Sequence, residues 1–190
     1  MLYIIRHGKT EWNRAHILQG HRDHPLNEEG VAQARAAAEA LRGVTFTHVF
    51  SSPLQRAVQT ARIIAPDQEI VIDDRLIEMD YGPYEGTDLT ALPDELKRFF
   101  SDFVHEPAPD GMEPLRSVVS RTGAFVEELR DLPGNILIST HAIAMKGLLE
   151  YLTPQSEGRY WSKYIGNCAI YTVSCEDGQL GIPTEWKPAE

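Results

Sequence analysis

The sequence of 190 residues contains only two cysteines, Cys168 and Cys175, which is too few for a disulfide framework. It has no apolar run that approaches the roughly 20 residues needed for a membrane-spanning helix. It also lacks a basic segment followed by a long apolar stretch, so we expect no signal peptide. These absences predict a cytoplasmic protein whose two thiols are reduced and buried.

Basic residues are scarce as well. The chain has 18 Lys and Arg against 28 Asp and Glu, which gives a formal net charge of -10. Proteins that bind nucleic acids or anionic membranes need a positive field, so we expect neither kind of partner. A small anionic ligand remains compatible with this charge, because a few arginines can dominate the field inside a cleft.

Short apolar runs alternate with helical patterns along the chain, without repeats or low-complexity segments. A length of 190 residues and a hydrophobic share of 42% fit one domain, 1–190, with a substantial core. Several runs are continuously apolar, which is typical of strands covered on both faces. The alternation predicts a three-layer α/β/α sandwich with a mostly parallel sheet. The predicted strands are 2–6, 47–51, 70–73, 135–140 and 168–174.

Two of the predicted helices have clear start and stop signals. Asn27 can cap a helix that ends at Gly43. Ser52 and Gln55 have the spacing of a capping box for a second helix, which Pro66 ends.

Further helices are predicted after Pro114 and after His141. Apolar residues at helical spacing over 88–105 predict an extra helix, and we interpret about 85–113 as a small helical cap insertion. The tail at 170–186 predicts a hairpin that adds an antiparallel edge to the sheet.

Polar residues follow four of the predicted strands. His7 ends the first strand, and Arg56 lies in the first turn of the helix after the second. Glu78 follows the third strand, and His141 follows the fourth. Since ligands of open α/β sheets bind outside the carboxyl ends of the strands, we expect these side chains to converge at one edge.

This set of residues can bind a phosphate monoester and transfer its phosphoryl group. Arg6 and Arg56 can replace the hydration of the dianion with bidentate donors. A neutral His7 can attack phosphorus through one ring nitrogen while a backbone carbonyl binds the other. His141, if protonated, can stabilise the transferring oxygens, and Glu78 can protonate the leaving group and later activate water.

Two assignments keep alternatives. Asp80 and Glu85 lie near Glu78 in sequence, and one of these three acids should be the proton donor; Glu78 is favoured because it lies closest to the buried strand. A metal-dependent hydrolase would need ligands such as His16, His21 and His24. No carboxylate accompanies these histidines at a metal-binding spacing, so we expect no metal and no cofactor.

Five segments in order resemble the signature segments of the histidine phosphatase superfamily, in the branch of phosphoglycerate mutases and small-molecule phosphatases. The resemblance implies that His7 is phosphorylated, that Glu78 is the proton donor, and that the phosphate lies among Arg6, Arg56 and His141. Those segments are 6–13, 18–26, 51–61, 78–86 and 139–141.

The resemblance also implies additional substrate-binding residues. In addition to the residues named above, these are Gly8, Asn13, Gln19, Gly20 and Ala142. The sequence departs from the family pattern at Ile17, where arginine is frequent, and at Ala142, where glycine is frequent. Glu113 resembles the glutamate of another family turn, in which Pro114 replaces a serine. These departures concern the substrate more than the catalysis.

The function expected from these observations is hydrolysis of a small phosphorylated metabolite. The rival within the family is a phosphoglycerate mutase with a bisphosphoglycerate primer, for which a longer and more basic insert before His141 would be expected. The insert here is acidic and carries Phe99, Phe100 and Phe103, which suggests a partly apolar leaving group. A rival of another class is a phosphate-binding protein without catalysis.

The sequence does not determine the oligomeric state. Tyr160, Trp161 and Tyr164 can belong to the core, to a pocket wall or to an interface, and the core is favoured.

Overall fold

The computed structural model describes residues 1–187, and its centre is a six-stranded sheet in the order β3-β2-β4-β1-β5-β8. The first four of these strands are parallel, whereas β5 pairs antiparallel with β1 and β8 pairs antiparallel with β5. The predicted mostly parallel sheet with an antiparallel edge near the C-terminus is therefore confirmed. The strands are β1 (Leu2–Arg6), β2 (Phe46–Ser51), β3 (Ile70–Ile72), β4 (Asn135–Thr140), β5 (Ile170–Val173) and β8 (Thr184–Glu185).

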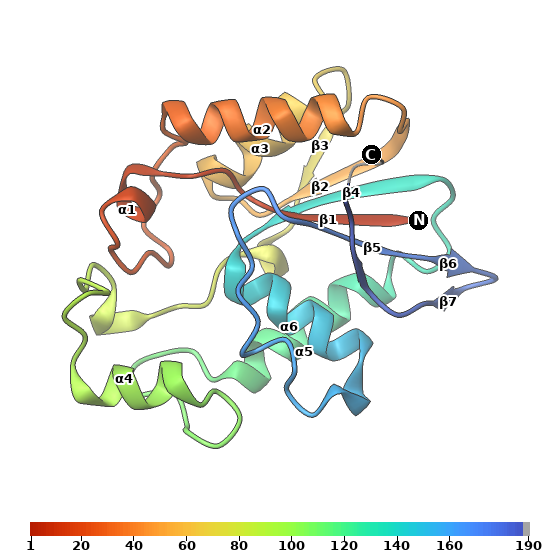
Figure 1. Ribbon diagram of the computed structural model, residues 1–190. Coiled ribbons are helices and arrows are strands. Elements are labelled where there is room, and N and C mark those ends of the chain that lie inside the picture. The colour runs from red at the N-terminus through yellow and green to blue at the C-terminus, as the bar shows by residue number, and fades with distance from the viewer. Residues whose placement is uncertain (188–190) are drawn as a thin grey trace.

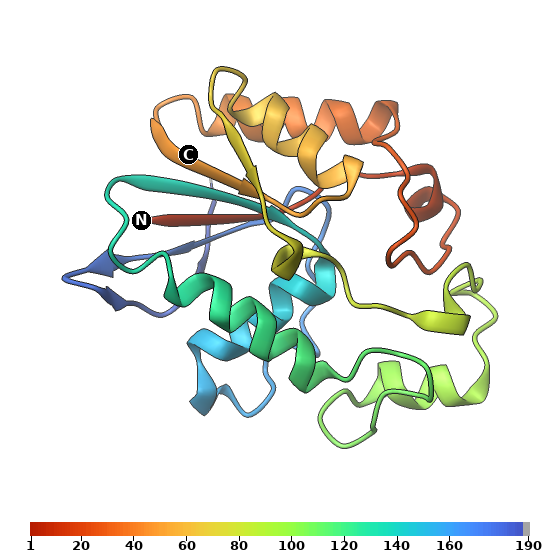
Figure 2. The ribbon, with the colours of Figure 1, turned by 180° about the vertical axis from the view of Figure 1, so that it is seen from behind.

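Four helices cover the two faces of the sheet (Figures 1 and 2). One face carries α2 (Glu28–Ala40) and α3 (Gln55–Ile64), and the other carries α5 (Leu115–Glu127) and α6 (Ala142–Leu152). Alternate residues of β1 supply two separate apolar cores, because successive side chains of a strand point to opposite faces. This confirms the predicted three-layer sandwich.

The carboxyl ends of the parallel strands face the rest of the chain. In Figure 1, α1 and α4 lie on the left, at the side toward which β1 runs from the N-terminus. A third apolar cluster joins this region to the main body through Met79, Phe99, Met112 and Ile143, among others. The remaining elements are α1 (Glu11–Arg14), α4 (Asp94–Ser101), the 3-10 turns η1 (Asp74–Leu76), η2 (Gly82–Tyr84) and η3 (Pro154–Ser156), and the hairpin of β6 (Cys175–Glu176) and β7 (Gln179–Leu180).

Helix boundaries were predicted well where a local cap operates. Asn27 Oδ1 accepts a hydrogen bond from Gly30 N at 2.8 Å at the start of α2, as predicted. The helices after Pro114 and His141 are also confirmed, and the second of them ends at Leu152. None of the helices within residues 1–187 combines the length and the apolar composition of a membrane span.

Two helix predictions were wrong in their bounds. Ser52 does not cap α3, because its backbone still pairs with the sheet through Ser52 N and Ser139 O, 3.0 Å apart, and the helix begins only at Gln55. The helix predicted over 88–105 is limited to Asp94–Ser101. Asp102 ends it, because its side chain accepts hydrogen bonds from the next backbone N–H groups instead of continuing the helix. The role of 85–113 as a cap stays a prediction.

Some burial predictions also needed correction. Tyr160 and Trp161 are buried as favoured, but Tyr164 is 84% exposed. Cys168 and Cys175 are free thiols that are only half-buried.

The loop that follows β1 lies directly against the first turn of α2. A Cβ atom on Gly8 would lie 2.5 Å from Gly30 O, and one on Gly30 would overlap Lys9 O. Only glycine permits this backbone approach, so the pair sets where the chain runs immediately after His7.

We expect Gly30→Ala to destabilise the fold by about 1–3 kcal/mol, the usual effect of overpacking. The matched control is Gly43→Ala, because a Cβ there meets nothing within 4 Å. Urea unfolding of both variants measures the difference. Equal stability of the two variants would show that the backbone contact is not a constraint.

Candidate active site

His7 lies at the carboxyl end of β1 and is 4% exposed. Its backbone N donates to Thr140 O at 2.9 Å, which extends the pairing of β1 with β4. Its Nδ1 lies 2.6 Å from Gly8 O. A carbonyl oxygen only accepts, so Nδ1 carries the proton and Nε2 keeps a free lone pair.

The charge state of His7 follows from its surroundings. Burial, assisted by the positive charges of Arg56 and Arg6, lowers the pKa of His7 well below its usual value of 6.5. The imidazole is therefore neutral at neutral pH. A neutral ring with an unprotonated Nε2 is the form required of a nucleophile.

His141 lies beside His7, with ring centroids 5.0 Å apart, and is fully buried as the N-cap of α6. Arg56 Nε donates to His141 Nδ1 at 3.3 Å, and His141 Nε2 lies 2.7 Å from Ser52 Oγ. Because a guanidinium only donates, Nδ1 must accept and the proton resides on Nε2. Burial and the Arg56 charge lower the pKa of His141 as well. The protonated His141 considered from the sequence is therefore not the form found here.

Arg56 is a fully buried arginine in the first turn of α3. Its terminal nitrogens donate to Arg22 O at 2.9 Å and to Gly20 O at 2.6 Å. Burial lowers its pKa to about 10, against the opposing charge of Glu78, so it remains a cation at neutral pH. Its remaining N–H groups are available to an anion.

Glu85 holds the same loop from its opposite side. Its Oε1 accepts hydrogen bonds from Gly20 N at 3.0 Å and from Arg22 N at 2.6 Å. The Glu85 carboxylate therefore binds the N–H groups of the 20–22 segment, and the Arg56 guanidinium binds its carbonyl groups. This arrangement fixes the direction of the Arg56 side chain.

Arg6 brings a second guanidinium to the site. One terminal nitrogen donates to Ile165 O at 2.6 Å. Its Nε is buried and has no hydrogen-bond partner within residues 1–187. Burial lowers the pKa of Arg6, and the nearest negative charge that opposes this effect is Glu78.

Glu78 is the only one of the three candidate acids that is buried, with 4% exposure. Its carboxylate accepts hydrogen bonds from Ile143 N at 3.1 Å and Ala144 N at 3.0 Å, in the first turn of α6. Asp80 instead binds the N–H of Gly82 at 2.8 Å. Glu78 is therefore tied to the helix that His141 begins, and it acts electrostatically on both arginines.

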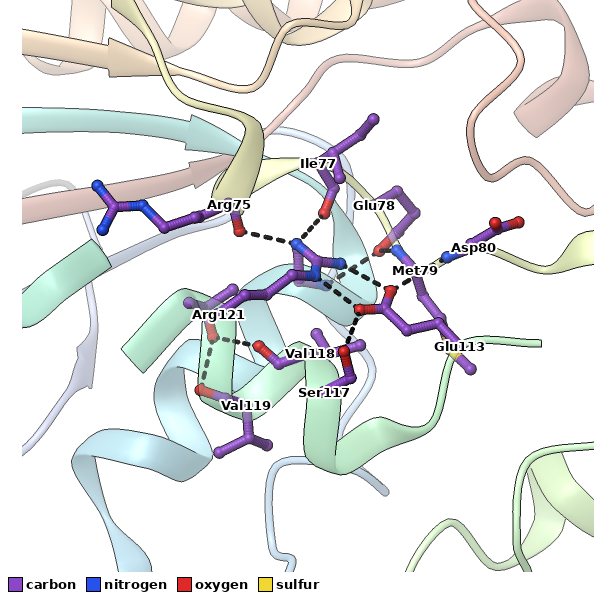
Figure 3. A network of polar contacts seen from close by, with 12 residues as sticks. Arg75, Ile77, Glu78, Met79, Asp80, Glu113, Ser117, Val118, Val119 and Arg121 are labelled. Atoms are coloured by element: carbon purple, nitrogen blue, oxygen red, sulfur yellow. Dashed lines mark hydrogen bonds and ion pairs between the residues drawn. The ribbon is translucent and has the colours of Figure 1, made fainter. Parts of the chain in front are cut away.

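A buried ion pair supports the segment that carries Glu78 (Figure 3). Arg121 pairs with Glu113 through two hydrogen bonds of 2.8 and 3.0 Å, and it also donates to Arg75 O and Ile77 O. Glu113 N donates to Asp80 O at 2.8 Å, and Glu113 Oε2 accepts a hydrogen bond from Asp80 N at 3.2 Å. The chain is thus held on both sides of Glu78. Sequence reasoning missed Arg121, because nothing distinguishes it from a surface arginine of α5.

The additional residues implied by the resemblance differ in their burial and in their hydrogen bonds. Gln19 is buried, its Oε1 accepts from Thr10 Oγ1 at 2.7 Å, and its Nε2 has no partner within residues 1–187. Asn13 Oδ1 accepts from Thr10 N in the cap of α1. Ala142 opens α6, where a backbone N–H has no intrahelical partner.

The backbone N–H groups of the two glycines in this set are already engaged. Gly8 N donates to Thr60 Oγ1 at 3.0 Å, and Gly20 N donates to Glu85. Their role in substrate binding stays a prediction.

The three histidines considered as metal ligands lie in different surroundings. His21 Nε2 donates to Glu78 O at 2.8 Å, and His24 stacks on Trp12 with centroids 4.4 Å apart. His16 occupies a turn with a φ of 54°. In the part of the chain that the structure describes, no three His, Cys, Asp or Glu residues gather in a way that could hold a metal ion.

Comparison with known proteins identifies relatives along almost the whole chain. A family model described as histidine phosphatase superfamily (branch 1) matches residues 2–184. The chain is 32% identical to "Probable phosphoglycerate mutase GpmB" of Enterobacter sp. (strain 638), over 93% of this chain and 85% of that protein. It is 30% identical to "Phosphoserine phosphatase 1" of Hydrogenobacter thermophilus, over 93% and 87% of the two chains.

Solved structures show the same likeness. A phosphoserine phosphatase mutant from Entamoeba histolytica in complex with phosphoserine aligns with a TM-score of 0.82 and 28% identity, covering 98% of this chain and 94% of that one. A mycobacterial glucosyl-3-phosphoglycerate phosphatase in complex with VO3 aligns with a TM-score of 0.82 and 27% identity, covering 91% and 92%.

The two buried neutral histidines should make stability depend on pH. In the unfolded chain each imidazole binds a proton below about pH 6.5, whereas in the folded protein it does so only at lower pH. The contribution of the two histidines to the free energy of unfolding is therefore complete above about pH 6.5. It decreases as the pH falls, by about 1.4 kcal/mol per pH unit for each proton that the unfolded chain binds in excess.

We expect His141→Asn to reduce this slope by about one proton, since asparagine does not titrate in this range. His16→Asn removes an exposed histidine and should leave the slope unchanged. Chemical unfolding between pH 4.5 and pH 8 measures the slopes. An unaltered slope in His141→Asn would contradict the neutral assignment.

Proposed function

The chain belongs to branch 1 of the histidine phosphatase superfamily, and we propose that it hydrolyses a small phosphomonoester through a phosphohistidine at His7. The observation that carries this proposal is the hydrogen bond from His7 Nδ1 to Gly8 O. It leaves Nε2 unprotonated on a ring that feels the positive charges of Arg56 and Arg6. That combination suits attack on an anionic phosphorus centre.

Phosphate binding is the first proposed step. Arg56 is fully buried and Arg6 is half-buried, and neither cation has a carboxylate within ion-pairing distance in the described residues 1–187. A phosphate dianion supplies the missing negative charge and accepts hydrogen bonds from their remaining N–H groups. The neutral His141 can donate its Nε2–H to a transferring oxygen in place of Ser52 Oγ.

Chemistry then follows in two transfers. The lone pair of His7 Nε2 forms a bond to phosphorus, the bond to the ester oxygen breaks, and Glu78 delivers a proton to the departing alkoxide. Gly8 O stabilises the positive charge on the phosphorylated ring through Nδ1–H. Glu78 next takes a proton from water, which attacks phosphorus and releases inorganic phosphate and neutral His7.

The proposed substrate is a small phosphorylated metabolite. Related proteins are named for phosphoserine and for glucosyl-3-phosphoglycerate, and one related structure contains 3-phosphoglyceric acid. The second candidate is a mutase, which the name of the relative from Enterobacter supports. The acidic insert of this chain favours hydrolysis, because it adds no cations to hold an acidic substrate through two orientations. Placement in the cytoplasm stays a prediction.

We expect His7→Ala to abolish phosphate release from a panel of phosphomonoesters and to prevent labelling of the enzyme by a radioactive phosphoryl donor. The panel includes 3-phosphoglycerate with a 2,3-bisphosphoglycerate primer, and His16→Ala serves as the exposed-histidine control. Release of phosphate by His7→Ala at the wild-type rate would refute the nucleophile. Primer-dependent isomerisation faster than phosphate release would establish the mutase alternative.

A pair of glutamate variants separates the proton donor from the loop anchor. Glu78→Gln should lower kcat by about 10²–10⁴-fold, the usual contribution of a general acid. Glu85→Gln keeps an oxygen that can accept from Gly20 N and Arg22 N, so it should retain most of kcat. Glu85→Ala removes that acceptor and should weaken inhibition by vanadate, because Arg56 loses its support. A Glu85→Gln variant as slow as Glu78→Gln would identify Glu85 as the acid.

A further inference from the structure

Lys146 is a cation near the site that the proposed mechanism does not use. It lies one helical turn after Ala142 on the same face of α6. Side chains of a helix lean toward its N-terminus, which here is the end capped by His141. The ammonium donates to Trp161 O at 2.8 Å and lies 5.4 Å from the centre of the Phe103 ring.

The surroundings of Lys146 are unusual for a lysine. Burial lowers its pKa to about 8, Glu78 opposes the shift and Arg6 adds to it, so both of these site residues are near enough to act on it. No carboxylate within residues 1–187 forms an ion pair with Lys146. Lys146 is half-buried, so its ammonium is partly removed from water, and an external anion is a natural partner for it.

The charges of the site lead to the same conclusion. Arg56 is fully buried, Arg6 and Lys146 are half-buried, and the charge of Glu78 acts on all three cations. When Glu78 carries the proton destined for the leaving group, no protein anion among them remains. A bound phosphate dianion balances about two of the cations. One positive charge is then left for a further negative group on the substrate.

We propose that Lys146 binds a carboxylate on the leaving group, and that it thereby selects phosphorylated carboxylic acids over neutral phosphomonoesters. This inference rests on the proposed function and specifies its substrate class. Trp161 O occupies one N–H of the ammonium, and the others are free to donate. Phe103 covers the ammonium with an apolar surface against which a short carbon chain can pack.

A structural role for Lys146 is the competing explanation, since its bond to Trp161 O attaches the loop after α6 to the helix. The two roles predict different effects of a Lys146 substitution on the rates for different substrates. A structural defect lowers the rates for all substrates alike. A specificity residue changes the ratio between substrates that differ only in the carboxylate.

Two matched substrate pairs provide this ratio: 3-phosphoglycerate with glycerol 3-phosphate, and O-phosphoserine with O-phosphoethanolamine. In each pair the second member lacks the carboxylate. We expect the wild type to have the higher kcat/KM for the acid in at least one pair. Lys146→Met keeps the packing and should reduce that preference by roughly 10- to 100-fold, the range for a hydrogen bond to a charged group. Lys146→Arg should retain it.

Lys97→Met is the control, because it removes an exposed lysine of α4 that pairs with Asp94 on the same helix. An unchanged ratio in Lys146→Met, or a wild type that prefers the neutral member of both pairs, would overturn the inference while leaving the phosphatase intact. Failure of the proposed function is distinct, because the wild type would then release no phosphate even from p-nitrophenyl phosphate, and both proposals would be withdrawn.

Discussion

The burial of Arg56 is the constraint on which the rest of the site depends. A guanidinium with no exposed surface needs acceptors, and here backbone carbonyls of the 20–22 segment and His141 Nδ1 accept three of its N–H groups. These bonds determine the tautomer of His141 and the course of the loop. Burial and the same positive charge keep His7 neutral. One buried cation thus adds to the effect of burial on both histidines and keeps further N–H groups for an anion.

The reactive side chains are supported by a second set of polar residues from distant parts of the chain. Glu85 holds the loop beneath Arg56, and the Arg121–Glu113 pair holds the chain on both sides of Glu78. Preorganisation of this kind matters because phosphoryl transfer relies on positioning and charge stabilisation more than on covalent chemistry by the protein. The resemblance to the family implies which residues react, whereas these supports explain how those residues are held.

The proposed substrate class follows from charge balance rather than from shape. The chain as a whole is acidic, with a net charge of -10, yet its site gathers buried and half-buried cations that lack carboxylate partners in the described residues. Such a local surplus attracts a substrate with more negative charge than a simple phosphate ester. Lys146 lies toward the aromatic residues Phe103 and Trp161, where the leaving group would extend. Catalysis would then depend on His7 and its neighbours, and selectivity on Lys146.

The sequence by itself determined the sandwich, the succession of strands and helices along the chain, and the residues at the carboxyl ends of the strands. These features are local, because apolar runs define strands and the next polar residue must emerge at the edge of the sheet. Only the tertiary structure decided the neutral state of His141, the use of Ser52 as its partner, the support from Arg121 and the surroundings of Lys146. Each of these features depends on contacts between residues far apart in sequence. Burial and hydrogen-bond partners control the pKa values and the tautomers of side chains, and no local sequence pattern encodes either.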